Sequence, residues 1–191
     1  MNLVGAIQSA PLADLAILLG LFAFVFIGVL EGAIRRLIGI AAILFAFLFA
    51  ANLRDPVGSF LAQNWTQWDL GYNRLLAFVI IFVVLAVGAS IATQGFYKRT
   101  NLLPDRPMVD DVVGGVLGLL EGVLLLMLLV VIFNSNILPA AGPGDLTLLR
   151  WGQDLIVSQS HIASGIKSGL VPAFIHLLSG LLPSDLVSVF P

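Results

Sequence analysis

Four long apolar runs, separated by polar segments, dominate the pattern of this chain. They cover residues 12–30, 37–53, 75–97 and 112–133. About 20 apolar residues in an α-helix cross the hydrocarbon core of a bilayer, because each residue rises about 1.5 Å and the core is about 30 Å thick. All four runs have this length or approach it, although the second needs part of the preceding turn. The pattern therefore predicts an all-α integral membrane protein with four transmembrane helices.

The segments between the runs predict one tight hairpin and two loops. Residues 31–36 are too few for anything but a helical hairpin, and residues 98–111 hold two prolines, which end helices. Residues 54–74 contain Trp65 and Trp68, whose amphipathic rings favour the membrane–water boundary. We therefore expect the second connection to be a loop at that boundary.

The basic residues predict the orientation of the helices, because cytoplasmic loops are enriched in Lys and Arg. The short first and third connections hold Arg35, Arg36, Lys98, Arg99 and Arg106. The second connection and the tail hold two basic residues each. We expect the first and third connections on the cytoplasmic side and both chain ends outside.

The sequence changes in character after residue 133. Residues 134–145 are rich in Pro and Gly, which is typical of a loop, and residues 146–191 mix apolar and polar positions. The apolar segment 170–182 contains Pro172 and is short for a span, so an interfacial or re-entrant helix is favoured over a fifth transmembrane helix. We divide the chain into a four-helix membrane domain, residues 1–136, and an interfacial amphipathic helical tail, residues 137–191.

Composition supports lipid as the solvent of this chain. Apolar residues make up 59% of the 191 residues and charged residues 10%, where a soluble domain has about a quarter charged. The formal net charge of -2, without a basic stripe, argues against nucleic acid as a partner. The first eleven residues carry no Lys or Arg, so the first apolar run is expected to be a retained helix rather than a signal peptide.

Glycines at helical spacing mark two faces for close helix packing. The pattern Gly-x-Leu-Glu-Gly at residues 28–32 recurs at residues 118–122, either as a duplicated two-helix unit or as two independent packing motifs. In lipid, small residues allow the close contact on which helix association depends. The expected packing residues are Gly20, Gly28, Gly32, Gly114, Gly118 and Gly122. Packing within one subunit is favoured, with a homo-oligomer or a glycine-lined pore as alternatives.

Glu121 is the one charged residue inside the fourth apolar run, and we expect it near the middle of the membrane. An ionised carboxylate there is expensive, so it must be protonated or paired with a cation, with Arg35 and Arg36 as the candidates. A structural role in helix packing is favoured over a proton or ion relay. Glu31 and Arg35 stand four residues apart, in the favourable order for a helical ion pair.

Two aspartates are candidate helix caps, and no enzyme motif is evident. Asp14 and Asp110 precede or begin apolar runs, where a carboxylate can accept free backbone N–H groups. The chain has no cysteine, and its two histidines, His161 and His176, lack the clustered ligands of a metal site. We expect no catalytic activity, no metal and no cofactor.

The order of these motifs resembles the bacterial colicin V production protein (CvpA) family. That family has an Asp at the start of the first helix and a turn reading Gly-x-x-Arg-Gly-x-x-Arg-Glu. The positions that match here are Asp14, Gly28, Gly32 and Arg35. Glu31 stands at an Arg position of the pattern, and Arg36 stands at its Glu position.

The second family motif, Asp-Arg-x-x-Gly-x-x-x-Gly-x-x-Arg-Gly, belongs at the start of the last span. The positions that match are Asp110, Gly114, Gly118 and Gly122. Asp111 and Glu121 occupy its two Arg positions. The resemblance extends over about residues 12–185.

This resemblance implies a multi-pass protein of the bacterial cytoplasmic membrane. It implies a role in colicin V production or export and in envelope homeostasis, without an established catalytic activity. The expected partners are the lipid bilayer, envelope or export proteins, and a second copy of the chain. The alternative is a small oligomeric channel or transporter that uses the intramembrane carboxylate.

Overall fold

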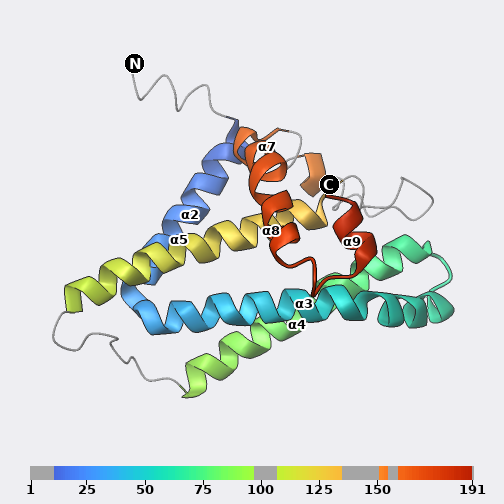
Figure 1. The fold of residues 1–191 in the computed structure, drawn as a ribbon, viewed down its shortest axis with the longest axis horizontal. Helices are drawn as coiled ribbons and strands as arrows, with labels where there is room; N and C mark the ends of the chain where they lie inside the picture. Colours follow the sequence, from blue (N-terminus) through green and yellow to red (C-terminus); the bar gives the residue numbers. More distant parts are fainter. Residues whose placement is uncertain (1–10, 97–106, 135–150, 155–158, 191) are drawn as a thin grey trace.

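The computed structural model describes residues 11–96, 107–134, 151–154 and 159–190. Its four long helices are α2 (Leu12–Glu31), α3 (Ala33–Asn64), α4 (Leu70–Phe96) and α5 (Pro107–Ile132) (Figure 1). Each is long and apolar enough to cross a membrane. The described part of the chain therefore confirms the all-α membrane fold and its four spans.

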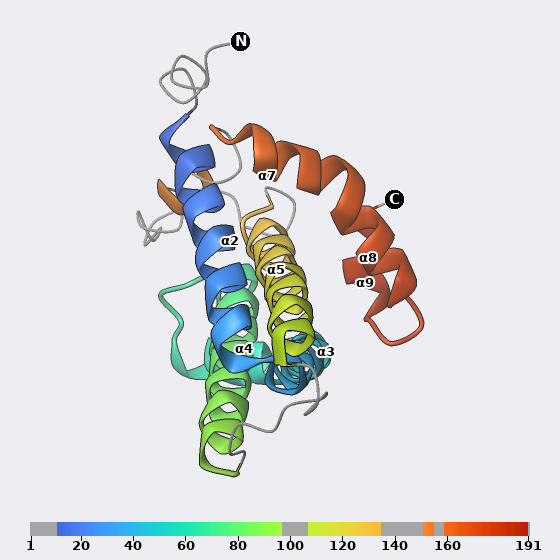
Figure 2. The same ribbon diagram turned by 90° about the vertical axis from the view of Figure 1, so that its left-hand side faces the viewer.

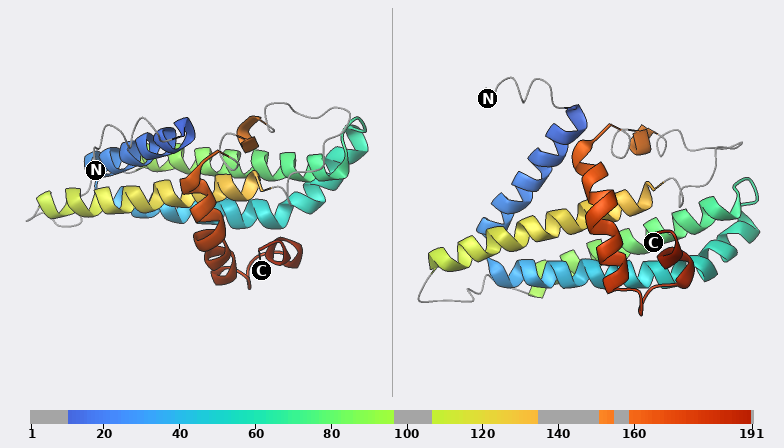
Figure 3. Two further views of the ribbon diagram at one scale, coloured as in Figure 1. Left: turned by 90° about the horizontal axis from the view of Figure 1, so that it is seen from above. Right: turned by 45° about the horizontal axis from the view of Figure 1, so that its top comes forward.

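The long helices pack in the order α2, α5, α3 and α4. The largest contacts join α3 to α4 and α2 to α5, while α5 also lies against α3. The helices α3, α4 and α5 run roughly side by side, whereas α2 crosses them obliquely, so that its first turns lie away from α3 and α4 (Figures 1 and 3). A hydrophobic cluster that includes Phe47, Phe78 and Val130 fills the interior.

The outer surface of these helices is apolar as well. Exposed side chains include Phe22 on α2, Val84 and Ile91 on α4, and Val112 on α5. Monomeric soluble proteins rarely expose continuous apolar surface of this kind. The arrangement is that of a helix bundle whose surroundings are lipid.

The α2–α3 hairpin depends on Gly32. Its φ of 80° lies in the left-handed region, where a side chain is strained, and it is the one such residue in the described ranges. Its N–H donates to the carbonyl oxygen of Gly28 at 3.0 Å, which ends α2, and α3 begins at the next residue. The predicted hairpin is therefore confirmed, with a single glycine as its turn.

Helix α3 is longer than the sequence pattern predicts. The expected loop at residues 54–74 is mostly helical, because α3 continues through Pro56 to Asn64 and α4 begins at Leu70. A proline inside a helix removes one backbone hydrogen bond and bends the helix without always ending it, and α3 bends over its last turns (Figure 3). At about 1.5 Å per residue, 32 residues span about 48 Å, so α3 is longer than the hydrocarbon core is thick.

The tail forms a continuous helical run followed by a short separate helix. The run consists of α7 (His161–Gly165), the π-helical segment η2 (Ile166–Leu170) and α8 (Val171–Leu177), and it is followed by α9 (Ser184–Ser188). It lies across one side of the bundle, against α2 and α5 (Figures 1 and 2). Within residues 170–182, predicted as an interfacial or re-entrant helix, the chain is helical as far as Leu177. The described residues form no fifth candidate span, and the interfacial location stays a prediction.

The π-helical segment keeps one face of the tail turned toward the bundle. The buried tail residues Ala163, Ile166, Val171 and Ile175 are separated by three, five and four positions. The five-residue step coincides with the π-helical segment, which adds one residue to the turn. Pro172 is its physical cause, since proline has no N–H for the carbonyl four residues earlier and its ring crowds that group.

Candidate functional site

The glycines of α2 and α5 form a backbone-to-backbone contact, here called the glycine interface. A Cβ built on Gly28 would overlap the backbone of Gly114, and a Cβ on Gly118 would overlap the carbonyl group of Phe24. A Cβ on Gly122 would lie 3.1 Å from Leu21 and Phe24. The glycine faces of α2 and α5 therefore pack against one another inside one chain, as in the favoured interpretation, and the two Gly-x-Leu-Glu-Gly segments meet at Gly28 and Gly118.

Gly20 differs from the other five predicted packing residues. A Cβ on Gly20 would meet no neighbouring residue within 4 Å. Gly20 instead lines an apolar cleft of about 320 Å³ between α2 and α5, together with Ala16 and Leu125. The prediction for Gly20 is therefore corrected: its spacing is right, but the oblique crossing takes it out of contact.

The charged residues at positions 31, 35, 36 and 121 form one cluster. The Nη1 atom of Arg36 donates to Oε2 of Glu121 at 2.5 Å, and Nη2 of Arg36 lies 3.0 Å from Glu31. Glu31 also pairs with Arg35 at 3.6 Å. Arg36 and Glu121 are buried, with 6% and 9% of their surface exposed. The cluster joins α2, α3 and α5 and has a formal charge of zero.

Glu121 lies deeper in the bundle than the α2–α3 hairpin. Gly114 packs against Gly32 in the hairpin, and Glu121 follows seven residues later, about 10 Å deeper by helical rise. In a hydrocarbon core about 30 Å thick, this depth is compatible with a position near the middle. The mid-membrane position of Glu121 therefore stays a prediction.

Gly39 makes room for the buried carboxylate, although the sequence shows it only as one glycine among nineteen. A Cβ on Gly39 would lie 3.1 Å from Oε1 of Glu121. Its position three residues after Arg36 places both on one face of α3. That spacing is the signal by which Gly39 can be recognised as part of the site.

A cavity of about 280 Å³ adjoins the Arg36–Glu121 pair. The four long helices all contribute to its wall, and the charged residues of the cluster line it. The other lining residues are Gly39, Ala42, Ile43, Ala86, Val87, Ala89, Ser90 and Leu125. The walls are therefore polar at the cluster and mostly small or apolar elsewhere.

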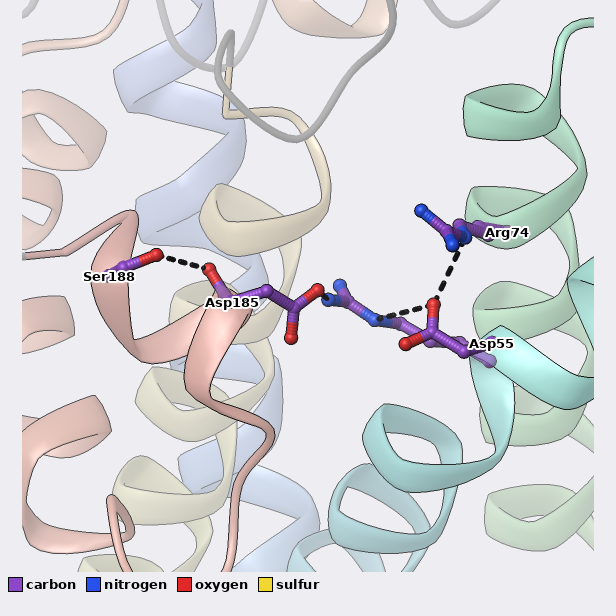
Figure 4. Close-up of polar contacts among 5 residues, drawn as sticks. Asp55, Arg74, Asp185 and Ser188 are labelled. Carbon is purple, nitrogen blue, oxygen red and sulfur yellow. Dashed lines mark hydrogen bonds and ion pairs between the residues drawn. The ribbon is translucent and has the colours of Figure 1, made fainter.

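A second ion-pair network, in the C-terminal half of α3, involves residues that were not expected from the sequence (Figure 4). Arg54 pairs with Asp185 of α9 and lies 4.0 Å from Asp55, which pairs with Arg74 of α4 at 3.1 Å. Arg54 and Arg36 are 18 residues apart, about 27 Å by helical rise. This separation is close to the thickness of a hydrocarbon core.

Asp14 caps a helix other than the one expected. The N-cap of α2 is Pro11, without a side-chain hydrogen bond. The Asp14 carboxylate instead accepts from the Ser160 hydroxyl at 2.5 Å and from the backbone N–H groups of His161 and Ile162 at 3.3 and 3.2 Å. The prediction is corrected because the free N–H groups of α7 lie within reach of this carboxylate.

Asp110 lies in the first turn of α5 and is buried, with 1% of its surface exposed. A Cβ on Gly32 would lie 2.7 Å from its Oδ2 atom, so Asp110 packs against the hairpin. The residue preceding α5 lies outside the described ranges, and a capping role for Asp110 therefore stays a prediction.

The ion pair gives a physical account of two departures from the family pattern described above. The resemblance implies an acidic residue at position 36 and a basic residue at position 121, whereas this chain has Arg36 and Glu121. Since the two side chains contact one another, the double exchange keeps opposite charges together.

Comparisons with known proteins agree with the motifs and the fold. A family model described as colicin V production protein matches residues 13–169, which is most of the chain. The match ends within the tail, sixteen residues before the expected end of the resemblance. Searches of curated proteins and of solved structures give no match. The chain belongs to the colicin V production protein family, as a membrane protein with four candidate spans.

Proposed function

We propose that this protein is a non-enzymatic scaffold of the bacterial cytoplasmic membrane that supports colicin V production or export and contributes to envelope homeostasis. The family match supports this biological role. The observation that supports a scaffold is the pairing of Arg36 with Glu121, because it neutralises a buried carboxylate and fixes α5 against α3. Envelope or export proteins, or a second copy of the chain, are the partners in this proposal.

A buried ion pair of this kind acts mainly on the uniqueness of the packing. Desolvation offsets much of its Coulomb energy, but removal of one partner leaves an uncompensated charge and costs about 3–5 kcal/mol. The glycine interface supports the same role, since its contacts are already made within the chain. Partners would therefore bind to surfaces other than the two paired glycine faces.

The test is complementation in a colicin V-producing strain that lacks this protein. Secreted toxin is measured as killing of a sensitive lawn, and the membrane level of each variant is measured beside it. We expect Glu121→Gln to reduce both and the exchange Arg36→Glu with Glu121→Arg to restore both. Equal toxin secretion with and without the wild-type gene would exclude the role in production or export.

A channel or transporter is the second candidate, and the cavity beside Glu121 is the observation that favours it. The purified protein in liposomes would then conduct ions or protons, and Glu121→Gln would change the flux. Absence of flux under an imposed gradient would remove this candidate and leave the scaffold.

A further inference from the structure

We propose that the cavity beside Arg36 and Glu121 is a water-filled vestibule, closed at its inner end, that hydrates this ion pair from the hairpin end of the bundle. The proposal concerns what occupies the cavity, and it does not depend on the role in colicin V production. Its evidence is a buried donor, the charge balance of the lining, and the size of the side chains that form the walls.

The buried donor is the Nε–H group of Arg36. Within the described residues it has no hydrogen-bond partner, although Arg36 is only 6% exposed and lines the cavity. A buried donor on a charged group is costly when it is left without an acceptor. Water is the smallest molecule that can accept from this group and also donate to the nearby carboxylates of Glu31 and Glu121.

The cavity is large enough and polar enough to keep such water. Its volume of about 280 Å³ compares with about 30 Å³ for one molecule in liquid water, so several molecules fit. Buried waters are typically held by about three hydrogen bonds. Hydrogen-bond donors and acceptors for such waters lie along one wall of the cavity. The donors are the guanidinium groups of Arg35 and Arg36, and the acceptors are the carboxylates of Glu31 and Glu121.

The charges in the lining favour water over an ion. Helix α2 contributes Glu31, α3 contributes Arg35 and Arg36, and α5 contributes Glu121, while α4 contributes the neutral Ser90. The two positive and two negative charges sum to zero, so neither an anion nor a cation meets an excess of opposite charge. A neutral, hydrogen-bonding molecule is the occupant that this lining suits.

The side chains of the walls explain both the space and its inner end. Small residues at Gly39, Ala42 and Ala86 leave room between α3 and α4. Beyond Glu121 the lining becomes apolar at Ile43 and Leu125, and Phe47, one turn further along α3, is fully buried. The vestibule is therefore closed within the bundle and does not cross it.

Single cysteines test this inference directly, because the chain has no cysteine of its own. Ala86→Cys and Ala89→Cys place a thiol on the vestibule wall. The control variants Val84→Cys and Ile91→Cys place it on positions of α4 that are 63% and 65% exposed and do not line the cavity. The full-length proteins in liposomes are treated with a charged, water-soluble methanethiosulfonate reagent, and the labelling rates are compared.

Thiolates react and thiols do not, and burial in hydrocarbon raises the pKa of a thiol by more than one unit. We therefore expect Ala86→Cys and Ala89→Cys to react at least about tenfold faster than both controls. Ile91 is closer than Ala86 to the C-terminal end of α4. Faster labelling at position 86 than at position 91 therefore cannot result only from a shallower position in the membrane. Thermal unfolding of each variant verifies that it is folded before labelling.

Two results would overturn the proposal of a water-filled vestibule. Wall cysteines that react as slowly as the controls would show a dry cavity, and controls that react as fast as the wall would show labelling unrelated to the cavity. Ser90→Cys provides a second, nearly isosteric probe of the same wall if an alanine position does not tolerate the change. Toxin secretion does not enter the readout, so loss of the proposed function would leave this result standing.

Discussion

Removal of either member of the Arg36–Glu121 pair is expected to destabilise the protein by different amounts. Glu121→Gln leaves Arg36 with Glu31 at 3.0 Å, so a compensating charge remains. Arg36→Gln leaves the buried Glu121 carboxylate without a compensating charge, because Arg36 is its only ion-pair partner within the described residues. The difference in stability between the two variants therefore follows from the geometry of the charged cluster.

The expected magnitudes follow from this geometry. Arg36→Gln should cost about 3–5 kcal/mol, as for other buried pairs that lose one partner. Glu121→Gln should cost about 1–3 kcal/mol, because the guanidinium keeps a second carboxylate. For a chain of this size 1 kcal/mol corresponds to about 2–4 °C, so Arg36→Gln should lower Tm by roughly 6–20 °C.

Thermal unfolding in one detergent, followed by circular dichroism, measures both single variants and the double variant. Arg36→Gln with Glu121→Gln should recover much of the loss, since no charge is then left uncompensated. Equal losses for the two single variants would refute the role of Glu31. A double variant whose loss equals the sum of the single losses would refute the pair itself.

Three further predictions address the rest of the structure. Gly118→Leu should separate α2 from α5 and lower Tm, or abolish accumulation of the protein in the membrane. Gly20→Leu should change Tm little. Equal effects of the two substitutions would contradict the glycine interface. Asp14→Ala should remove three hydrogen bonds at the start of α7 and speed amide hydrogen exchange at residues 161 and 162. Unchanged exchange would argue against Asp14 as the cap of α7. Asp185→Asn should lower the free energy of unfolding by less than about 1 kcal/mol, because the Arg54–Asp185 pair is partly exposed and Arg54 retains Asp55. A larger decrease in Tm would show that α9 contributes more to stability than this contact.

The sequence predicts those features that depend on local spacing. Apolar runs of sufficient length predict the four spans, and the short polar segment at residues 31–36 predicts the hairpin. The i, i+4 spacing of Gly114 and Gly118 predicts a small-residue face on α5. Each of these inferences uses residues within one helix or one turn.

Contacts between distant segments could not be predicted in this way. Asp14 meets Ser160 across 146 positions, and Arg54 meets Asp185 across 131, and neither pair has a spacing that indicates contact. The extension of α3 is not predicted because Pro56 is typical of a loop, although a proline can bend a helix without ending it. Gly20 was misplaced because the crossing of α2 over α5 depends on the whole bundle.

The pairing of α2 with α5 has a consequence for biogenesis. Arg36 is synthesised 85 positions before Glu121, an interval of about 4–17 s at about 5–20 residues per second. During that interval Glu31, within the same hairpin, is the carboxylate available to Arg36, and the glycines of α2 have no helix to contact. The nascent chain therefore holds an incomplete bundle until its fourth span arrives, and a stall in translation before α5 would leave an intermediate for quality-control proteases to recognise.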